Sequence, residues 1–364
     1  ILRFKRYFKD ATIVRLGQNY RSTKIIVEAA SKVIEKNKER LGKTLFAQSR
    51  TGEKIKLIYA KTPEREAELV VQTILHNGEY RDTVVLYRTA RQSRLIEEKL
   101  VKYNIPYVVI GGVRFYERKE IKDILAYLRL IYNKDDDMAL LRIINVPHRG
   151  LGKKAVETLR LLGEVKKNSM FKAIDYIDET DLIKKQKNTL KKFKVSIESV
   201  NVNEKPERLI NIVLYELGYI DELEQEKETY TSRMENINEL REKASEYEKL
   251  EELLMSLPLA HPIDEWREKE CVTLMTAHNA KGLEFKNVFI IGLEEGLFPH
   301  INSIHDGTVE EERRLFYVAL TRAKEQVYLS FSEWRHGGYI TPSRFIREIP
   351  THYIEVLYYD DSDS

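Results

Sequence analysis

The sequence predicts an α/β fold with a parallel sheet, interrupted by an all-helical insertion. Short apolar runs resemble strands buried on both faces, and helical patterns separate most of them, which is typical of a parallel sheet. From about 117 to 256 strand-like runs vanish and helical periodicity replaces them. We therefore expect one α/β domain, 1–116 plus 257–364, and an insertion, 117–256. The expected strands are Ile55–Ala60, Thr83–Tyr87, Val272–Thr276, Val288–Gly292 and Val327–Phe331.

Helices can be assigned on both sides of the insertion boundary. Ser22 has a side chain suited to an N-cap, and the apolar residues that follow it share one helical face. A second helix is expected from Ser93 to about Lys102. Within the insertion one apolar stripe is clear. That stripe consists of Ile121, Ile124, Leu125, Leu128 and Ile131.

Composition limits the class of protein. The 364 residues suit two or three domains, and a hydrophobic fraction of 42% excludes wholesale disorder. The sequence contains no apolar run of about eighteen residues and no signal-peptide pattern. Cys271 is the single cysteine, which excludes a disulfide framework and a multi-cysteine metal site, so we expect a reducing, cytoplasmic setting. A net charge of +3 does not by itself indicate nucleic acid. Because the chain begins at Ile1, we interpret it as part of a longer protein.

A phosphate-binding loop is missing from the sequence. Such a loop needs G-x-x-x-x-G-K-[ST], because its glycines let backbone N–H groups surround the phosphates. The nearest match is Gly42-Lys43-Thr44, but Asn37 stands in place of the first glycine, and a helix end explains the segment better. Acidic pairs such as Asp221-Glu222 and Asp264-Glu265 do not end apolar strands, so no magnesium carboxylate is predicted. We expect no complete ATPase site in this chain.

Five short segments carry the strongest pattern. Three of them read QNYRS, MTAHNAKGLEF and EERRLFYVALTRAK, and they closely resemble the fourth, fifth and sixth helicase motifs of the UvrD/PcrA/Rep family of superfamily 1 DNA helicases. The other two resemble further signatures of that family. The segments occur in family order, and the resemblance covers essentially the whole chain. They are Gln18–Ser22, Leu86–Thr89, Phe115–Asp123, Met275–Phe285 and Glu311–Lys324.

The resemblance implies that the α/β domain is the second RecA-like domain of an ATP-driven motor, a P-loop NTPase-type fold without its own P-loop. In such motors one domain holds the phosphates and the other supplies arginines that stabilise charge on the transferred phosphoryl group. Arg21 and Arg322 match these catalytic, ATP-contacting arginines. Tyr20 matches the aromatic that stacks on adenine, Glu284 matches the acid at the sugar side, and Gly282 belongs to the same ATP-binding motif. Taken alone, each has an ordinary explanation as a surface or packing residue.

The resemblance also implies contacts to a single DNA strand. Translocation along a strand needs backbone contacts and base stacking. Arg88, Thr89, Thr276 and His278 match positions on the DNA-facing side of the family's domain. The chain departs from the family at Ala90, where relatives commonly carry Asn, so one amide contact to DNA is lost.

The insertion contains a glycine pair before a helical pattern. Gly150 and Gly152 expose helix N-terminal N–H groups, which favour a phosphate, and Lys153 and Lys154 add charge. The segment resembles the family's Gly-x-Gly contact to duplex DNA, although a simple helix-entry turn explains the pattern equally well. The lysine-rich run Lys184–Lys194 is interpreted as a solvated helix face.

The whole protein is thus expected to be an ATP-dependent DNA helicase that moves 3′ to 5′, with ATP and Mg²⁺ as cofactors and DNA repair or replication restart as its setting. Its partners would be single-stranded and duplex or junction DNA, the N-terminal RecA-like domain of the same protein, and DNA repair proteins. The chain alone is expected to be inactive as an ATPase. Two alternatives stay open: a non-catalytic DNA- or protein-binding module, and a fragment of an AddA/RecB-type helicase–nuclease.

Overall fold

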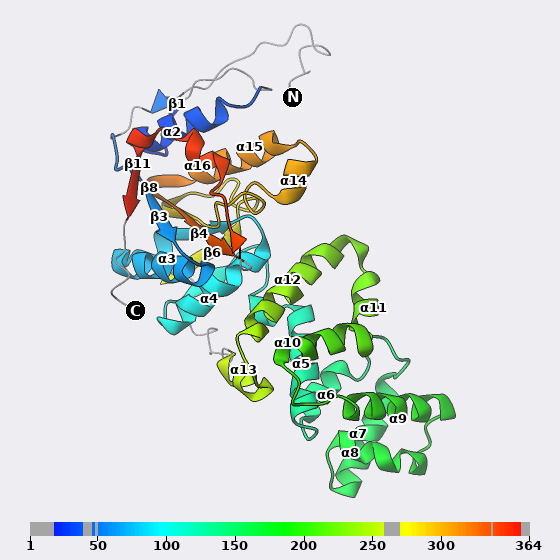
Figure 1. Ribbon diagram of the computed structural model, residues 1–364. Coiled ribbons are helices and arrows are strands. Elements are labelled where there is room, and N and C mark those ends of the chain that lie inside the picture. The colour runs from blue at the N-terminus through cyan, green and yellow to red at the C-terminus, as the bar shows by residue number, and fades with distance from the viewer. Residues whose placement is uncertain (1–17, 39–45, 48–49, 258–269, 336–337, 358–364) are drawn as a thin grey trace. The chain divides into compact units, whose positions relative to one another are not determined.

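The computed structural model describes residues 18–38, 46–47, 50–257, 270–335 and 338–357. The chain divides into two compact units, residues 1–114 with 260–364 and residues 115–259 (Figure 1). The expected boundaries, 116/117 and 256/257, lie two and three residues from these positions. The Gly42-Lys43-Thr44 segment lies outside the described residues.

The first unit is built on one parallel sheet. Within the described residues this sheet has seven strands in the order β11-β3-β8-β7-β4-β6-β5, and every neighbouring pair is parallel. All strands therefore begin at one edge, here called the amino edge, and end at the opposite carboxyl edge. The strands are β3 (Ile55–Ala60), β4 (Thr83–Tyr87), β5 (Tyr107–Val109), β6 (Val272–Thr276), β7 (Phe285–Ile290), β8 (Ala323–Ser332) and β11 (Ile354–Leu357). Two short pairs lie outside the sheet, β1 (Gln18–Asn19) with β2 (Phe46–Ala47) and β9 (Trp334–Arg335) with β10 (Gly338–Tyr339).

Helices cover both faces of this sheet (Figure 1). Residues of α2, α15 and α16 share one core with the sheet, and residues of α3 and α4 share another. Burial on both faces explains why the strands are continuous apolar runs. The predicted α/β class with a parallel sheet is confirmed. The helices are α2 (Lys24–Ile34), α3 (Pro63–Asn77), α4 (Ser93–Lys102), α14 (Ile301–His305), α15 (Val309–Leu320) and α16 (Arg344–Glu348).

The strand prediction was correct for β3, β4 and β6 and inexact for β7 and β8. The real β7 begins before Val288 and ends at Ile290 rather than Gly292. Gly292 lies beyond the strand at φ +63°, and its N–H donates to the buried Glu66 at 2.8 Å. A turn toward that carboxyl group therefore ends the strand. The strands β5 and β11, which were not predicted, are the two outermost strands of the sheet.

The start of α2 differs from the prediction. Its N-cap is Thr23, not Ser22. The buried Ser22 hydroxyl donates instead to the Ala323 carbonyl at 2.6 Å. Naming Ser22 as the N-cap was wrong, because a partner distant in sequence takes its hydroxyl. This bond ties the start of α2 to the start of β8.

The second unit consists of helices and loops, with no strand among its described residues, and it has a core of its own. The apolar stripe predicted on its first helix is buried there. The helices are α5 (Lys119–Tyr132), α6 (Asp137–Ile143), α7 (Lys153–Lys166), α8 (Met170–Ala173), α9 (Lys184–Glu198), α10 (Pro206–Asn211), α11 (Tyr219–Glu224), α12 (Lys227–Ser245) and α13 (Leu250–Ser256), with shorter 3₁₀ or π segments at Phe115–Glu117, Ile174–Glu179 and Ile212–Glu216.

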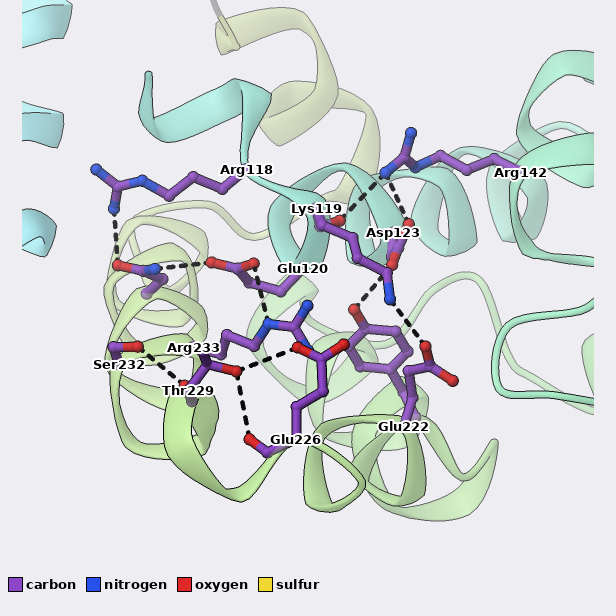
Figure 2. A network of polar contacts seen from close by, with 12 residues as sticks. Arg118, Lys119, Glu120, Asp123, Arg142, Glu222, Glu226, Thr229, Ser232 and Arg233 are labelled. Carbon is purple, nitrogen blue, oxygen red and sulfur yellow. Dashed lines mark hydrogen bonds and ion pairs between the residues drawn. The ribbon is translucent and has the colours of Figure 1, made fainter. Parts of the chain in front are cut away.

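A polar network fastens the start of α5 to α12 (Figure 2). Arg118 Nη1 donates to Asn236 Oδ1 at 2.7 Å, and Asn236 Nδ2 donates to Glu120 Oε1, also at 2.7 Å. All three side chains are buried. Buried polar groups need such partners, because an unpaired one costs its full desolvation penalty.

The same end of α5 is also joined to α6 and α11 (Figure 2). The buried Asp123 accepts a hydrogen bond from Tyr219 Oη at 2.9 Å and pairs with Arg142 Nη2 at 2.8 Å. Burial raises the pKa of Asp123 even though Arg142 opposes the shift. The family-like segment Phe115–Asp123 therefore supplies internal connections of the helical unit.

Among the described residues, no helix is long and apolar enough to cross a membrane. In the same part of the chain, no group of three or more His, Cys, Asp or Glu side chains could hold a metal ion.

Candidate functional site

One cluster of charged residues gathers at the amino edge of the sheet. Glu284 directly precedes β7, Arg322 directly precedes β8, and Phe285 pairs with Ala323 at the start of these parallel strands. The register therefore places Glu284 and Arg322 side by side. Arg21, which precedes α2, lies beside them because the hydrogen bond from Ser22 to the Ala323 carbonyl ties the start of α2 to the start of β8.

Arg21 is held from three sides. Its Nε donates to Glu284 Oε2 at 2.8 Å, and its Nη1 donates to the Thr321 carbonyl at 3.1 Å. Its backbone N–H donates to Asn19 Oδ1 at 2.8 Å. These contacts fix the direction of the guanidinium before any ligand binds, which lowers the entropy lost on binding.

Arg322 has only neutral hydrogen-bond partners among the described residues. Its Nε donates to the Val318 carbonyl at 2.9 Å, its Nη1 to the Leu283 carbonyl at 3.1 Å and its Nη2 to Thr321 Oγ1 at 3.3 Å. Burial lowers the pKa of Arg322, and the positive charge of Arg21 lowers it further. Two guanidinium groups that repel one another, one without a bonded carboxylate, favour an added anion.

Glu284 and Tyr20 complete the amino-edge cluster. Glu284 also pairs with Lys324 at 2.9 Å, and hydrogen bonds from Lys324 and then Arg21 hold the pKa of its carboxyl group below the ordinary range. Tyr20 is 81% exposed, so its ring is available to an external partner. Gly282, in the turn before Glu284, has φ +94°, a conformation that favours glycine. The structure thus brings together the residues predicted to contact ATP.

The residues predicted to contact single-stranded DNA lie at the carboxyl edge. Arg88 and Thr89 follow β4, and His278 follows β6, which ends at Thr276. The strands are neighbours, since Tyr87 pairs with Thr276. The two predicted groups therefore lie at opposite ends of the parallel strands of one sheet, the first before β7 and β8 and the second after β4 and β6.

Arg88 is not a free cation in this arrangement. Its Nε and Nη2 both donate to the carboxylate of Glu312, each with a contact of 2.9 Å, and the Glu312 side chain is only 6% exposed. Sequence reasoning missed Glu312, although it lies in the quoted EERRL segment, because its partner is in another motif. Burial opposes its ionisation, but hydrogen bonds from Arg88, the His300 N–H and Ser303 outweigh burial and lower the pKa of Glu312.

His278 lies beside this ion pair. Burial lowers its pKa, and the charge of Arg88 lowers it further. The imidazole is therefore neutral at neutral pH and can donate or accept a hydrogen bond. A neutral, exposed imidazole suits contact with a base or sugar better than charge attraction to a phosphate.

A single helix joins the two groups. Glu312 is in the first turn of α15, and Arg322 follows its last residue by two positions. The 12 residues of α15 span roughly 18 Å at the rise of an α-helix.

The predicted glycine pair of the helical unit lies in a loop with internal support. Asn145 Oδ1 accepts from the N–H groups of Arg149 at 2.8 Å and Leu151 at 3.1 Å. Gly150 has φ +73°, whereas Gly152, the N-cap of α7, has an ordinary φ of −70°. A positive φ is therefore required at Gly150 only. A Cβ added at either glycine would meet no heavy atom within 4 Å, so both face open space.

Lys153 and Lys154 begin α7 and are both exposed. Neither has an ion-pair partner among the described residues. Both positive charges are therefore available to an external anion.

Comparison with known proteins assigns the chain to a family. Residues 14–334 match the model of the UvrD-like helicase C-terminal domain. The chain belongs to this family. The ATP-dependent DNA helicase PcrA of Staphylococcus aureus is 43% identical over 379 residues, which cover 98% of this chain and 52% of that protein.

A second relative and one solved structure show similar coverage of this chain. The PcrA helicase of Staphylococcus epidermidis is 42% identical over 374 residues, covering 96% of this chain and 51% of that protein. The C-terminal domain of a possible DNA helicase from Lactobacillus plantarum WCFS1 aligns over 93% of this chain and 98% of its own, at a TM-score of 0.37 and 10% identity. The chain spans about half the length of the curated relatives it matches.

Proposed function

We propose that this chain is the C-terminal half of an ATP-dependent 3′-to-5′ DNA helicase, in which it supplies arginines to a nucleotide held mainly by the preceding half. The arrangement that carries this proposal is the Arg21–Glu284–Arg322 cluster, with its Arg21–Glu284 bond of 2.8 Å. ATP and Mg²⁺ supply the phosphoryl group and the metal charge when bound, with the metal ligands expected in the other half.

The roles of the residues follow from their surroundings. Arg322 carries a charge with neutral partners only, and it would stabilise negative charge that develops during phosphoryl transfer. Arg21 would act beside it. Glu284 would orient Arg21 and, with a carboxylate oxygen, contact the sugar. The exposed ring of Tyr20 would stack on the base.

DNA contacts would come from the other edge of the sheet and from the helical unit. Arg88, Thr89, Thr276 and His278 would face the single strand, and His278 would act as a neutral hydrogen-bonding group. In the helical unit the loop at Gly150 would contact the duplex backbone, since its glycines face open space. The N-terminal motor domain and, in the cell, repair proteins would be the protein partners.

The proposal is tested with the full-length protein and the 364-residue chain side by side. The full-length protein should unwind a duplex with a 3′ single-stranded tail but not one with a 5′ tail, and single-stranded DNA should stimulate its ATP hydrolysis. The chain alone should show no DNA-stimulated turnover. Turnover by the chain alone at about one per second, an ordinary enzymatic rate, would contradict the proposal.

A further inference from the structure

A pocket of about 200 Å³ in the helical unit borders the loop that carries the glycine pair. Arg149, which belongs to this loop, forms one wall. The helix α9 forms another with Thr189, Lys192 and Ser196, which share one helical face at spacings of three and four. The apolar floor includes the Phe193 ring, and the Arg149 guanidinium lies 5.0 Å from its centroid.

Arg149 brings a positive charge to this pocket without a carboxylate partner among the described residues. Its Nη1 donates to the carbonyls of Ile143 and Val146, each at 2.9 Å, and its Nη2 donates to Tyr127 Oη at 2.6 Å. These contacts satisfy its hydrogen bonds with neutral oxygens and hold it in place. The positive charge still acts on whatever enters the pocket.

The lysine-rich helix α9 is not a uniform solvated face. Lys191 pairs with Asp178, and Lys194 pairs with Asp175 and Glu198. Lys192 is exposed and has no ion-pair or hydrogen-bond partner among the described residues, and the same holds for the Ser196 hydroxyl.

One acidic side chain also borders the pocket, and its charge is met elsewhere. Glu216 pairs with Arg208 at 3.2 Å, outside the group of pocket residues. The local balance is therefore two cations, Arg149 and Lys192, against one carboxylate that has its own counter-ion. Such a pocket attracts an anion.

We infer that this pocket binds a backbone phosphate of the duplex that the glycine loop contacts. Lys192 Nζ and the Ser196 hydroxyl donate to the phosphate oxygens. The positive charge of Arg149, on the adjoining wall of the pocket, attracts the phosphate as well. This inference rests on the proposed duplex contact and extends it from the loop to α9. Because Arg149 belongs to the glycine loop and also lines the pocket, the loop contact and the pocket contact to the duplex are adjacent.

The test compares two neighbouring lysines of α9 in the full-length protein. Lys192→Ala removes the free cation, and Lys191→Ala, the matched control, removes one already paired with Asp178. Affinity is measured by salt titration on a 3′-tailed duplex and on the matching single strand. We expect Lys192→Ala to lower the log–log salt slope on the tailed duplex by about 0.9, the value for one phosphate, and to leave the single strand unchanged. Lys191→Ala should change neither slope.

The glycine loop provides the second comparison. A variant carrying Gly150→Val and Gly152→Val tests the proposed duplex contact itself. If the glycine variant weakens duplex binding and Lys192→Ala behaves like Lys191→Ala, the pocket inference is wrong and the duplex contact stands. If neither change affects duplex binding, both are wrong.

An isolated phosphate ion is the other possible occupant, and it gives a different result. Inorganic phosphate would then raise the melting temperature of the wild type but not of Lys192→Ala, while duplex affinity stayed equal in the two. That outcome would overturn the assignment to DNA. Because Lys192 has no partner among the described residues, its removal should leave the circular dichroism spectrum and melting temperature unchanged without phosphate.

Discussion

The ion pairs at the amino edge and at the carboxyl edge of the same sheet differ in how far their side chains are exposed to solvent. At the amino edge, Arg21 and Glu284 form an ion pair whose side chains are 28% and 45% exposed. At the carboxyl edge, Arg88 and Glu312 form one whose side chains are 19% and 6% exposed. The first pair is open to a ligand, whereas the second is largely closed. A motif can thus identify a residue without showing whether its charge is available.

The largest expected effect is on catalysis at the amino edge. In the full-length protein, Arg322→Ala should lower DNA-stimulated ATP turnover by roughly two to four orders of magnitude, because the variant loses a donor to the developing phosphoryl charge. Steady-state hydrolysis at saturating single-stranded DNA measures this effect. Turnover within about threefold of the wild type would remove Arg322 from the catalytic role.

The ion pairs themselves provide a stability comparison. Glu312→Ala should lower the free energy of unfolding by about 3 kcal/mol, because it leaves Arg88 partly buried without its carboxylate. Glu284→Ala, the matched change at the open edge, should cost less than about 1 kcal/mol, since exposed pairs contribute little. Denaturant unfolding of the 364-residue chain, followed by circular dichroism, measures both. Equal losses of unfolding free energy in the two variants would contradict the proposed difference between the buried and the exposed ion pair.

Much of the α/β unit could be predicted from the sequence because burial on both faces leaves continuous apolar runs. The missed strands, β5 and β11, are the short outermost strands of the sheet: β11 contains the exposed Glu355, and the apolar β5 has only three residues. The register of the strands and the side-chain partners far apart in the sequence could not be predicted. Nothing local shows that Ser22 bonds Ala323, or that Glu312 closes on Arg88 across 224 positions.

The next expected effect is a pH dependence of folding stability, which arises from a buried acid at the carboxyl edge. Glu66 is buried at the carboxyl edge, where Gly292 N–H and Ser330 Oγ donate to it. Burial, and then the nearby Glu294, raises its pKa to about 7 from an ordinary value of 4.5. Between these values the folded chain holds more protons than the unfolded chain, so stability falls as the pH rises.

Replacing Glu66 should remove this dependence. Glu66→Gln keeps a carbonyl oxygen for both donors and does not titrate. Relative to the wild type, the variant should become more stable as the pH rises from about 5 to about 8, by roughly 2–3 kcal/mol. Melting temperatures at the two pH values measure the change. A difference between variant and wild type that stays constant with pH would contradict the buried-acid account.

The most direct test of the division between the edges measures both functions in two variants of the full-length protein. Arg322→Ala should leave the Kd for single-stranded DNA, without nucleotide, within about twofold of the wild type while ATP turnover falls. His278→Ala should weaken single-strand binding by roughly tenfold, the loss of about one base contact, while turnover at saturating DNA stays near the wild-type value. The opposite pattern, with DNA binding abolished by Arg322→Ala and ATP hydrolysis intact, would contradict the placement of nucleotide at the amino edge and DNA at the carboxyl edge.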